Sequence, residues 1–173
     1  MLFWHIGGVL ALFRYVFRDP KVDVRFLTLG ALLPNLVDKP LGTLIFPDYF
    51  EVDRLYGHTL LFSTLIMVVT LLVTRRGRVR RKWMAVAIGA MLHLALDGMW
   101  TSGAVLFWPL LGVTFPTGVV PYWAGFLSRE LWSIPMLISE SFGLAYLVLL
   151  WRRSGLSDEQ VRAGFLSTGR LPV

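Results

Sequence analysis

The chain has 173 residues, about one domain by length, of which 55% are hydrophobic and 16% charged, and its mean hydropathy is +0.63. A soluble domain of this size needs more polar surface, so the composition excludes an ordinary water-soluble protein and favours one that lipid solvates. The absence of cysteine excludes disulfides and thiolate metal sites, and the net charge of +6 comes from short basic stretches between apolar runs.

Five apolar segments follow one another along the chain, and we expect each to be helical. They cover roughly residues 2–17, 26–37, 58–74, 83–100 and 131–151. A full span needs about 20 apolar residues, so the first two segments are expected to tilt, to thin the bilayer locally or to form a partly buried hairpin. The predicted fold is all-α, a polytopic membrane helical bundle of about five segments.

Two further stretches differ from these segments in composition. Residues 102–128 are apolar but rich in proline and glycine, which predicts a short helix followed by irregular chain at the outer interface. Residues 152–173 are polar. We therefore predict a membrane-embedded helical domain over 1–151 and a polar cytoplasmic tail over 152–173.

The basic residues predict an orientation in the membrane. Fourteen of the 17 Lys and Arg residues fall in 14–25, 75–82 and 152–173, and none precedes the first apolar run. Only Lys39, Arg54 and Arg129 fall in the other connections. The positive-inside rule then predicts a multi-pass protein of the cytoplasmic membrane with its N-terminus outside and its C-terminus inside.

In this topology all three histidines fall near outer helix ends. His5, His58 and His93 lie on the same side as Asp38 and Asp97. His93 and Asp97 are four residues apart, so they share a helix face and can reach one ion at about 2.0–2.2 Å each. Without cysteine, a transition-metal site must use such ligands. The pattern predicts an outer metal site; for the His–Asp pair alone, a polar helix end with a solvated aspartate is the alternative.

Glu140 lies within the last apolar segment, where an acid is costly unless it is paired or functional. It is predicted to be a metal ligand, a partner for a buried histidine, or a protonated hydrogen-bond donor to a neighbouring helix. Lys39 and Arg54 border the acid and histidine positions. Their cationic groups bind phosphate or carboxylate oxygens, and the alternative for both is snorkelling to the interface.

These residues lie in motifs that resemble the YdjM-like (DUF457) family of membrane-bound metal-dependent hydrolases. The motifs are His5, GALLPNLVDKP at 30–40, RLYGHTLLF at 54–62, HLALDGMW at 93–100 with LFWPLLG at 106–112, and ESFGL at 140–144. The family is similar, more remotely, to zinc-dependent phospholipase C and the P1-type nucleases. The resemblance thus implies one or two divalent ions, zinc foremost, and a phosphoester substrate. Where the family commonly has an acid, this chain has Asn35, which binds a metal only weakly and without charge.

The favoured hypothesis is hydrolysis of a lipid or lipid-linked phosphoester by a metal-activated water. Asp38 or Glu140 would accept the proton and Arg54 would neutralise the phosphoryl oxygens. The expected metal ligands are His5, Asp38, His58, His93, Asp97 and Glu140.

Two other functions stay open. One is a non-enzymatic metal-binding membrane adaptor or sensor; the other is an ion-coupled transporter, for which five segments without a repeat are a poor scaffold. Membrane lipids are expected partners. Nucleic acid is not, because the basic run 75–82 lies where topology already requires positive charge.

Overall fold

A computed structural model of the protein describes residues 1–46, 54–115 and 133–172, which form helices joined by turns. Each predicted apolar segment overlaps one long helix, although α2, α5 and α8 extend beyond the predicted bounds: α1 (Phe3–Val16), α2 (Val24–Pro40), α4 (Leu60–Val73), α5 (Arg78–Leu96) and α8 (Ile134–Ser154). The shorter elements are η1 (Leu41–Ile45), η2 (Tyr56–His58), η3 (Met99–Thr101), α6 (Gly103–Leu106) and α9 (Glu159–Thr168). The all-α prediction is confirmed for this part of the chain. Most of the irregular chain predicted after α6 lies outside the described residues, and so does Arg129.

Local sequence explains where several helices begin and end. Asp23 precedes α2 and Thr59 precedes α4, and each side chain accepts a backbone N–H of the first helical turn. Helix α8 has Pro135 in its first turn, where no N–H partner is needed. It ends at Gly155, whose φ of 67° suits a residue without a side chain.

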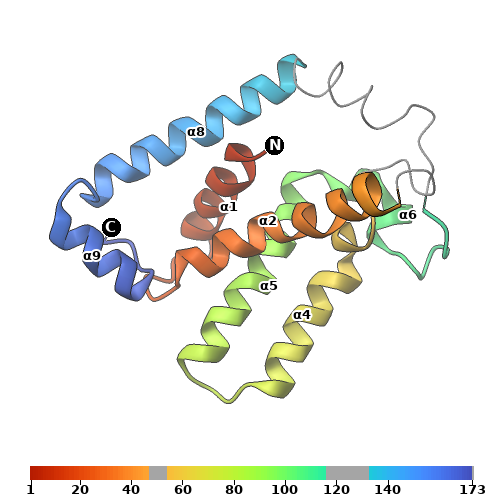
Figure 1. Ribbon diagram of the computed structural model, residues 1–173, viewed down its shortest axis with the longest axis horizontal. Coiled ribbons are helices and arrows are strands. Elements are labelled where there is room, and N and C mark those ends of the chain that lie inside the picture. The colour runs from red at the N-terminus through yellow and green to blue at the C-terminus, as the bar shows by residue number, and fades with distance from the viewer. Residues whose placement is uncertain (47–53, 116–132, 173) are drawn as a thin grey trace.

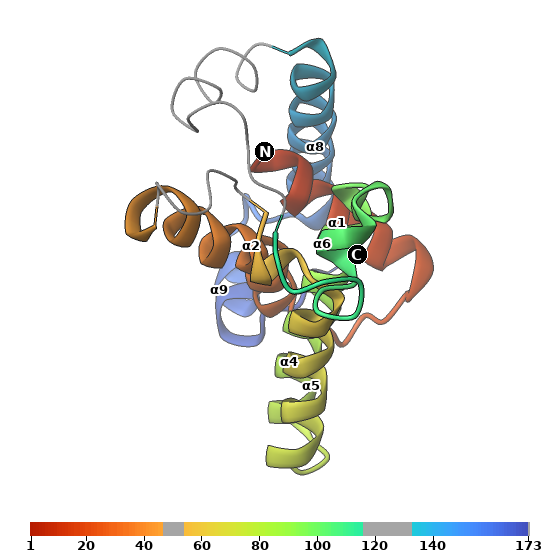
Figure 2. The same ribbon diagram turned by 90° about the vertical axis from the view of Figure 1, so that its right-hand side faces the viewer.

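The long helices pack in the spatial order α8, α1, α2, α5, α4, so the last long helix contacts the first (Figures 1 and 2). Gly7 of α1 and Gly143 of α8 face each other, and a Cβ on either would overlap the backbone of the partner helix. Gly30 and Gly89 have the same relation where α2 crosses α5. Glycines at such contacts let helix backbones approach closely, as is common between helices in membranes.

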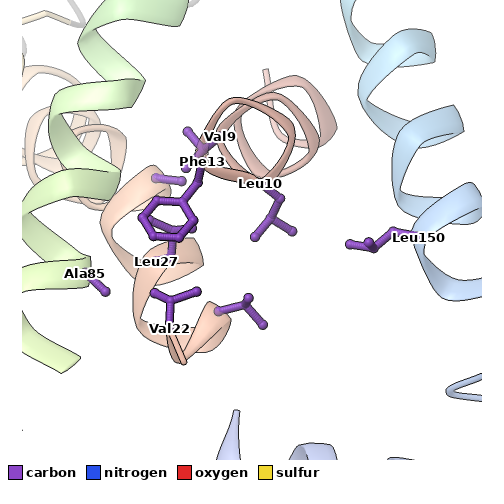
Figure 3. Packing of buried hydrophobic residues seen from close by; sticks show 9 residues of the cluster. Val9, Leu10, Phe13, Val22, Leu27, Ala85 and Leu150 are labelled. Atoms are coloured by element: carbon purple, nitrogen blue, oxygen red, sulfur yellow. The ribbon is translucent and has the colours of Figure 1, made fainter. Parts of the chain in front are cut away.

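The apolar core begins one turn after His5 on α1. Figure 3 shows Val9, Leu10 and Phe13 of α1 packed with side chains from three other helices. These are Leu27 of α2, Ala85 of α5 and Leu150 of α8. Val9 and Leu27 are fully buried. The core therefore fixes the helix that carries the first histidine.

Helices α4 and α8 turn apolar side chains outward. Leu72 and Val73 of α4 are 80% and 77% exposed, and Ile134 of α8 is 72% exposed. Apolar surface of this extent is typical of protein that faces lipid or a partner.

Among the described residues, α8 alone is long and apolar enough to cross a membrane by length and composition. Helices α1 and α4 are apolar but have 14 residues each. Helix α5 opens with a basic stretch. The other four predicted spans stay predictions.

The segment after α8 returns to the bundle. The carbonyl of Gly169 accepts the N–H of Val24 at 2.8 Å, and Arg25 Nη1 donates to Leu166 O at 2.6 Å. Phe165 of α9 packs against the core cluster. The predicted boundary at residue 151 falls inside α8, and α9 lies beside the start of α2 (Figure 1).

Candidate metal centre

Three buried histidines from three elements meet beside the start of α1. His5 lies on α1, His58 ends η2 and His93 lies in the last turn of α5. Their exposed fractions are 1%, 1% and 0%. The rings of His5 and His93 stack with centroids 4.0 Å apart, and the His58 ring meets His93 edge-on at 5.1 Å. The structure thus brings together all three histidines that the sequence placed at outer helix ends.

Each of these rings is held through its Nδ1 atom. The acceptors are oxygens at 2.6–2.7 Å: Met1 O for His5, Asp38 Oδ2 for His58 and Ala31 O for His93. Because carbonyl and carboxylate oxygens only accept, the neutral rings of His58 and His93 carry their hydrogen on Nδ1 and keep the Nε2 lone pair, whereas both nitrogens of His5 face oxygens. Proteins orient metal-binding histidines in this way.

Asp97 completes the cluster on the Nε2 side of the rings. Its Oδ1 lies 2.7 Å from His5 Nε2, and its Oδ2 lies 3.4 Å from His58 Nε2 and 3.7 Å from His93 Nε2. The Nε2 atoms of His58 and His93 are 3.3 Å apart. A tetrahedral zinc ion with bonds of about 2.0–2.1 Å holds its ligands roughly 3.4 Å apart, so most of these spacings suit one ion.

The donor set also calls for a cation. The Nε2 lone pairs of His58 and His93 and the Asp97 carboxylate all accept hydrogen bonds, and acceptors this close repel one another unless a proton or a metal ion lies between them. The ligand atoms of His5, His93 and Asp97 lie within 4.8 Å of one another. These three residues could hold a divalent ion; His58 is outside this close group, although its Nε2 lies 3.3 Å from His93 Nε2 and 3.4 Å from Asp97 Oδ2.

Asp38 reaches the cluster through His58. Its fully buried carboxylate accepts the backbone N–H groups of Leu55, Gly57 and His58 at 2.7–3.0 Å, besides the His58 ring. A Cβ on Gly57 would lie 2.9 Å from Asp38 Oδ1, so this wrapping of the backbone needs a glycine there. The sequence predicts a ligand or a base at Asp38; this geometry makes it a positioning residue.

Glu140 lies at the N-terminal end of α1. Its Oε2 accepts the N–H of Phe3 at 2.8 Å and so satisfies one of the free donors of the first turn. Its Oε1 is buried and has no hydrogen-bond partner in the described part of the chain. Glu140 thus fixes the turn that carries His5, and it is not in the close group that His5 forms with His93 and Asp97.

A pocket of about 220 Å³ opens beside the cluster. His5 and Asp97 line it together with Asn35, Lys39 and Arg54, and its other wall is formed by residues 133–139 at the start of α8. Arg54 Nη2 lies 3.6 Å from Asp97 Oδ2, and the Arg54 side chain is 38% exposed. An ion held by His5 and Asp97 would therefore face this pocket, with Asn35 as a neutral neighbour where the family commonly has an acid.

Two residues that hold the histidine rings could not be predicted from the sequence. Met1 and Ala31 act through backbone carbonyl oxygens, which carry no residue signature. Gly57 had a signal, because a glycine directly before His58 marks a position where backbone approaches another group closely.

A family model described as YdjM inner membrane protein matches residues 3–155 of the chain. The match runs from the start of α1 past the end of α8 and so includes every side chain of the cluster. No curated protein and no solved structure matches the chain.

Proposed function

The chain belongs to the YdjM inner membrane protein family, and from this we propose that it is a membrane-bound metal-dependent hydrolase acting on a phosphoester in a lipid or lipid-linked substrate. The observation that carries the proposal is the convergence of three Nε2 atoms and the Asp97 carboxylate beside a pocket. The remote similarity to zinc-dependent phospholipase C and P1-type nucleases, which the motifs imply, supplies the phosphoester class.

The proposed ion is zinc, held by His5, His58, His93 and Asp97, because imidazole nitrogen and carboxylate oxygen are its usual ligands where cysteine is absent. A bound divalent ion lowers the pKa of a water molecule from 15.7 towards about 7 and so supplies a nucleophile at neutral pH.

Residues beside the ion are proposed to stabilise the substrate charge and to accept the proton of the water. Arg54, at the pocket and partly exposed, neutralises charge on the phosphoryl oxygens, and Lys39 lines the same wall. Of the two acids expected as general base, Asp38 has both oxygens engaged, whereas Glu140 Oε1 makes no hydrogen bond within the described residues and lies 4.0 Å from the N-terminal ammonium of Met1. Glu140 is therefore the proposed proton acceptor, besides holding Phe3.

The lipid class is supported by the wall of the pocket. Residues 133–139 belong to the start of α8, the helix fit to cross a membrane. A substrate anchored in the bilayer beside α8 could place its headgroup in the pocket. With five spans, N-terminus outside and C-terminus inside, the pocket faces the extracytoplasmic side; an exported reporter fused to the C-terminus would contradict this topology.

The test is metal analysis and turnover of protein purified in detergent with added zinc. We expect stoichiometric zinc and release of phosphate or of a phosphorylated headgroup from a panel of lipid phosphates. His93→Ala should lose both. Arg54→Gln should keep zinc and lose most turnover. Glu140→Gln keeps an oxygen for Phe3 N–H but removes the base, so it should also keep zinc and lose turnover. Lys82→Gln, at the far end of α5, is the matched control.

The opposite results are equally clear. Protein without stoichiometric metal, or full activity in His93→Ala, would overturn the proposal. Zinc binding without turnover on any lipid of the panel would instead favour a metal-binding adaptor or sensor, and ion flux through liposomes would favour a transporter.

A further inference from the structure

A second group of charged side chains lies at the opposite end of α8 from the metal centre. Arg14 and Arg18, at the end of α1, and Arg153, in the last turn of α8, line a groove of about 550 Å³. Tyr15 and Tyr146 line it as well, together with two leucines of α8. The groove thus combines three cations with aromatic and apolar walls.

Within the described residues the three guanidinium groups form no ion pair, although Asp19 lines a neighbouring pocket with Arg14 and Arg18. No carboxylate of the described residues lies within 4.0 Å of them, whereas Arg25 nearby pairs with Asp23 at 2.8 Å. Asp19, next to Arg18 in the chain, accepts the backbone N–H of Lys21. Three like charges around one groove repel one another, so an anion bound between them would be stabilised.

The backbone at Arg18 is a second, independent observation. Its φ of 50° makes it the one non-glycine residue with positive φ in the described part of the chain. A helix commonly ends on a glycine in this conformation, because a side chain makes it unfavourable. Arg18 Nε donates to Tyr15 O at 3.2 Å, which holds the guanidinium at the end of α1. An unfavourable conformation kept for an arginine points to a function for that side chain.

The surroundings of the groove indicate the kind of anion. It lies at the end of the helix fit to span the membrane, and Val148 and Leu149 beside it are 45% and 53% exposed. Basic pockets between helices near the membrane surface bind anionic lipid headgroups. The guanidinium group of arginine suits phosphate oxygens because it offers two parallel N–H groups. We propose that this groove binds the phosphate of an anionic membrane lipid, whose acyl chains lie along the exposed apolar side chains of α8.

Native mass spectrometry of the detergent-purified protein with phosphatidylglycerol or phosphatidylcholine of the same acyl chains tests this site. We expect the wild type to prefer phosphatidylglycerol by about tenfold or more, as three arginines at headgroup level would give. The triple variant Arg14→Gln, Arg18→Gln, Arg153→Gln should show no preference. The matched control is Arg75→Gln, Arg76→Gln, Arg162→Gln, which removes the same charge from exposed positions outside the groove and should keep the preference.

The variant Arg18→Gly distinguishes a loss of lipid binding from a loss of folding. Glycine adopts a φ of 50° without strain, so this variant should be at least as heat-stable as the wild type while its lipid preference falls several-fold. An unchanged preference in the triple variant, or an equal loss in the control, would overturn the proposal. Displacement of the lipid by millimolar inorganic phosphate would also overturn it, in favour of a site for free phosphate.

Discussion

The two ends of α2 each carry an aspartate that organises a neighbouring segment, yet the two carboxylates lie in opposite surroundings. Asp38, at the C-terminal end, is fully buried and accepts three backbone N–H groups and the ring N–H of His58. Asp23, at the N-terminal end, is 5% exposed, but its partners Arg25 and Lys82 are cations with 35% and 41% of their side chains exposed.

The difference decides what each end of α2 can do. Water cannot replace a donor lost around Asp38, so that carboxylate holds the loop and the His58 ring in one geometry. Water and salt screen the charges around Asp23, so its pairs contribute little energy. Asp23 also orients the Arg25 guanidinium, which donates to Leu166 O in α9. The same residue type thus fixes a candidate site at one end and fastens a terminal helix at the other.

The largest effect is expected from Asp38→Asn. Asparagine removes the negative charge and keeps one acceptor oxygen instead of two, so its NH₂ group must face at least one of the N–H donors around Asp38 and the His58 ring loses its charged partner. We expect zinc affinity to fall by about 10–100-fold, the usual result of removing an outer partner of a ligating histidine. Competition titration with a zinc chelator measures this. Asp23→Asn should leave zinc affinity unchanged; equal losses in both variants would refute the contrast between the two ends.

Gly57→Ala should disturb the same loop through sterics alone. The new Cβ would lie 2.8 Å from Pro34 O and 2.9 Å from Asp38 Oδ1, so the loop must move away from α2. We expect a loss of about 1–3 kcal/mol in thermal or denaturant unfolding, with weaker zinc binding. Gly164→Ala on α9, where a Cβ meets open space, is the control and should be neutral or slightly stabilising. Wild-type zinc affinity in Gly57→Ala would contradict the role of the loop.

Gly169→Ala should release α9 from the other end of α2. Gly169 has a φ of 68°, and a Cβ there would overlap the Asp23 carboxylate. The expected cost is about 1–2 kcal/mol, confined to α9 and the start of α2. Hydrogen exchange should speed up in α9 while zinc affinity stays as in the wild type. Loss of zinc binding here would show that the two ends of α2 are coupled.

The smallest effect is expected from pH at Asp23. Burial raises the pKa of this carboxyl, but hydrogen bonds from Arg25 and the charges of Arg25 and Lys82 outweigh burial, so the pKa lies below its ordinary value of 3.8. A lowered pKa stabilises the folded state above pH 3.8, and that stabilisation is lost as the pH falls through the folded pKa. The stability difference between wild type and Asp23→Asn, below about 1 kcal/mol, should shrink on acidification below this value. A stability difference that grows on acidification would contradict the lowered pKa of Asp23.

The sequence predicted the helices and the members of the cluster for physical reasons. Apolar runs of sufficient length are helices in lipid, and His5, His58, His93 and Asp97 fall near the predicted outer ends. Placing them on one side required only the distribution of basic residues. Their meeting in one cluster is what the structure adds.

The roles of the other acids could not be predicted in the same way. Whether Asp38 faces an ion or a backbone depends on the conformation of residues 55–58, which hydropathy does not report. Glu140 meets Phe3 because α8 packs against α1, and the order of helices in space is not visible in their order along the chain. The docking of α9 is not visible in the polar composition after residue 151, in which Phe165 and Leu171 are the residues that pack against the core.

The hydrogen bond between Phe3 and Glu140 has a consequence for how the protein is made. The two residues are 137 positions apart, so α1 leaves the ribosome long before its anchor exists. His58, His93 and Asp97 can meet as soon as α5 has folded, but the turn that carries His5 is fastened only when α8 is present. The histidine synthesised first is therefore the last to be fixed, and the cluster is complete only when α8 is in place.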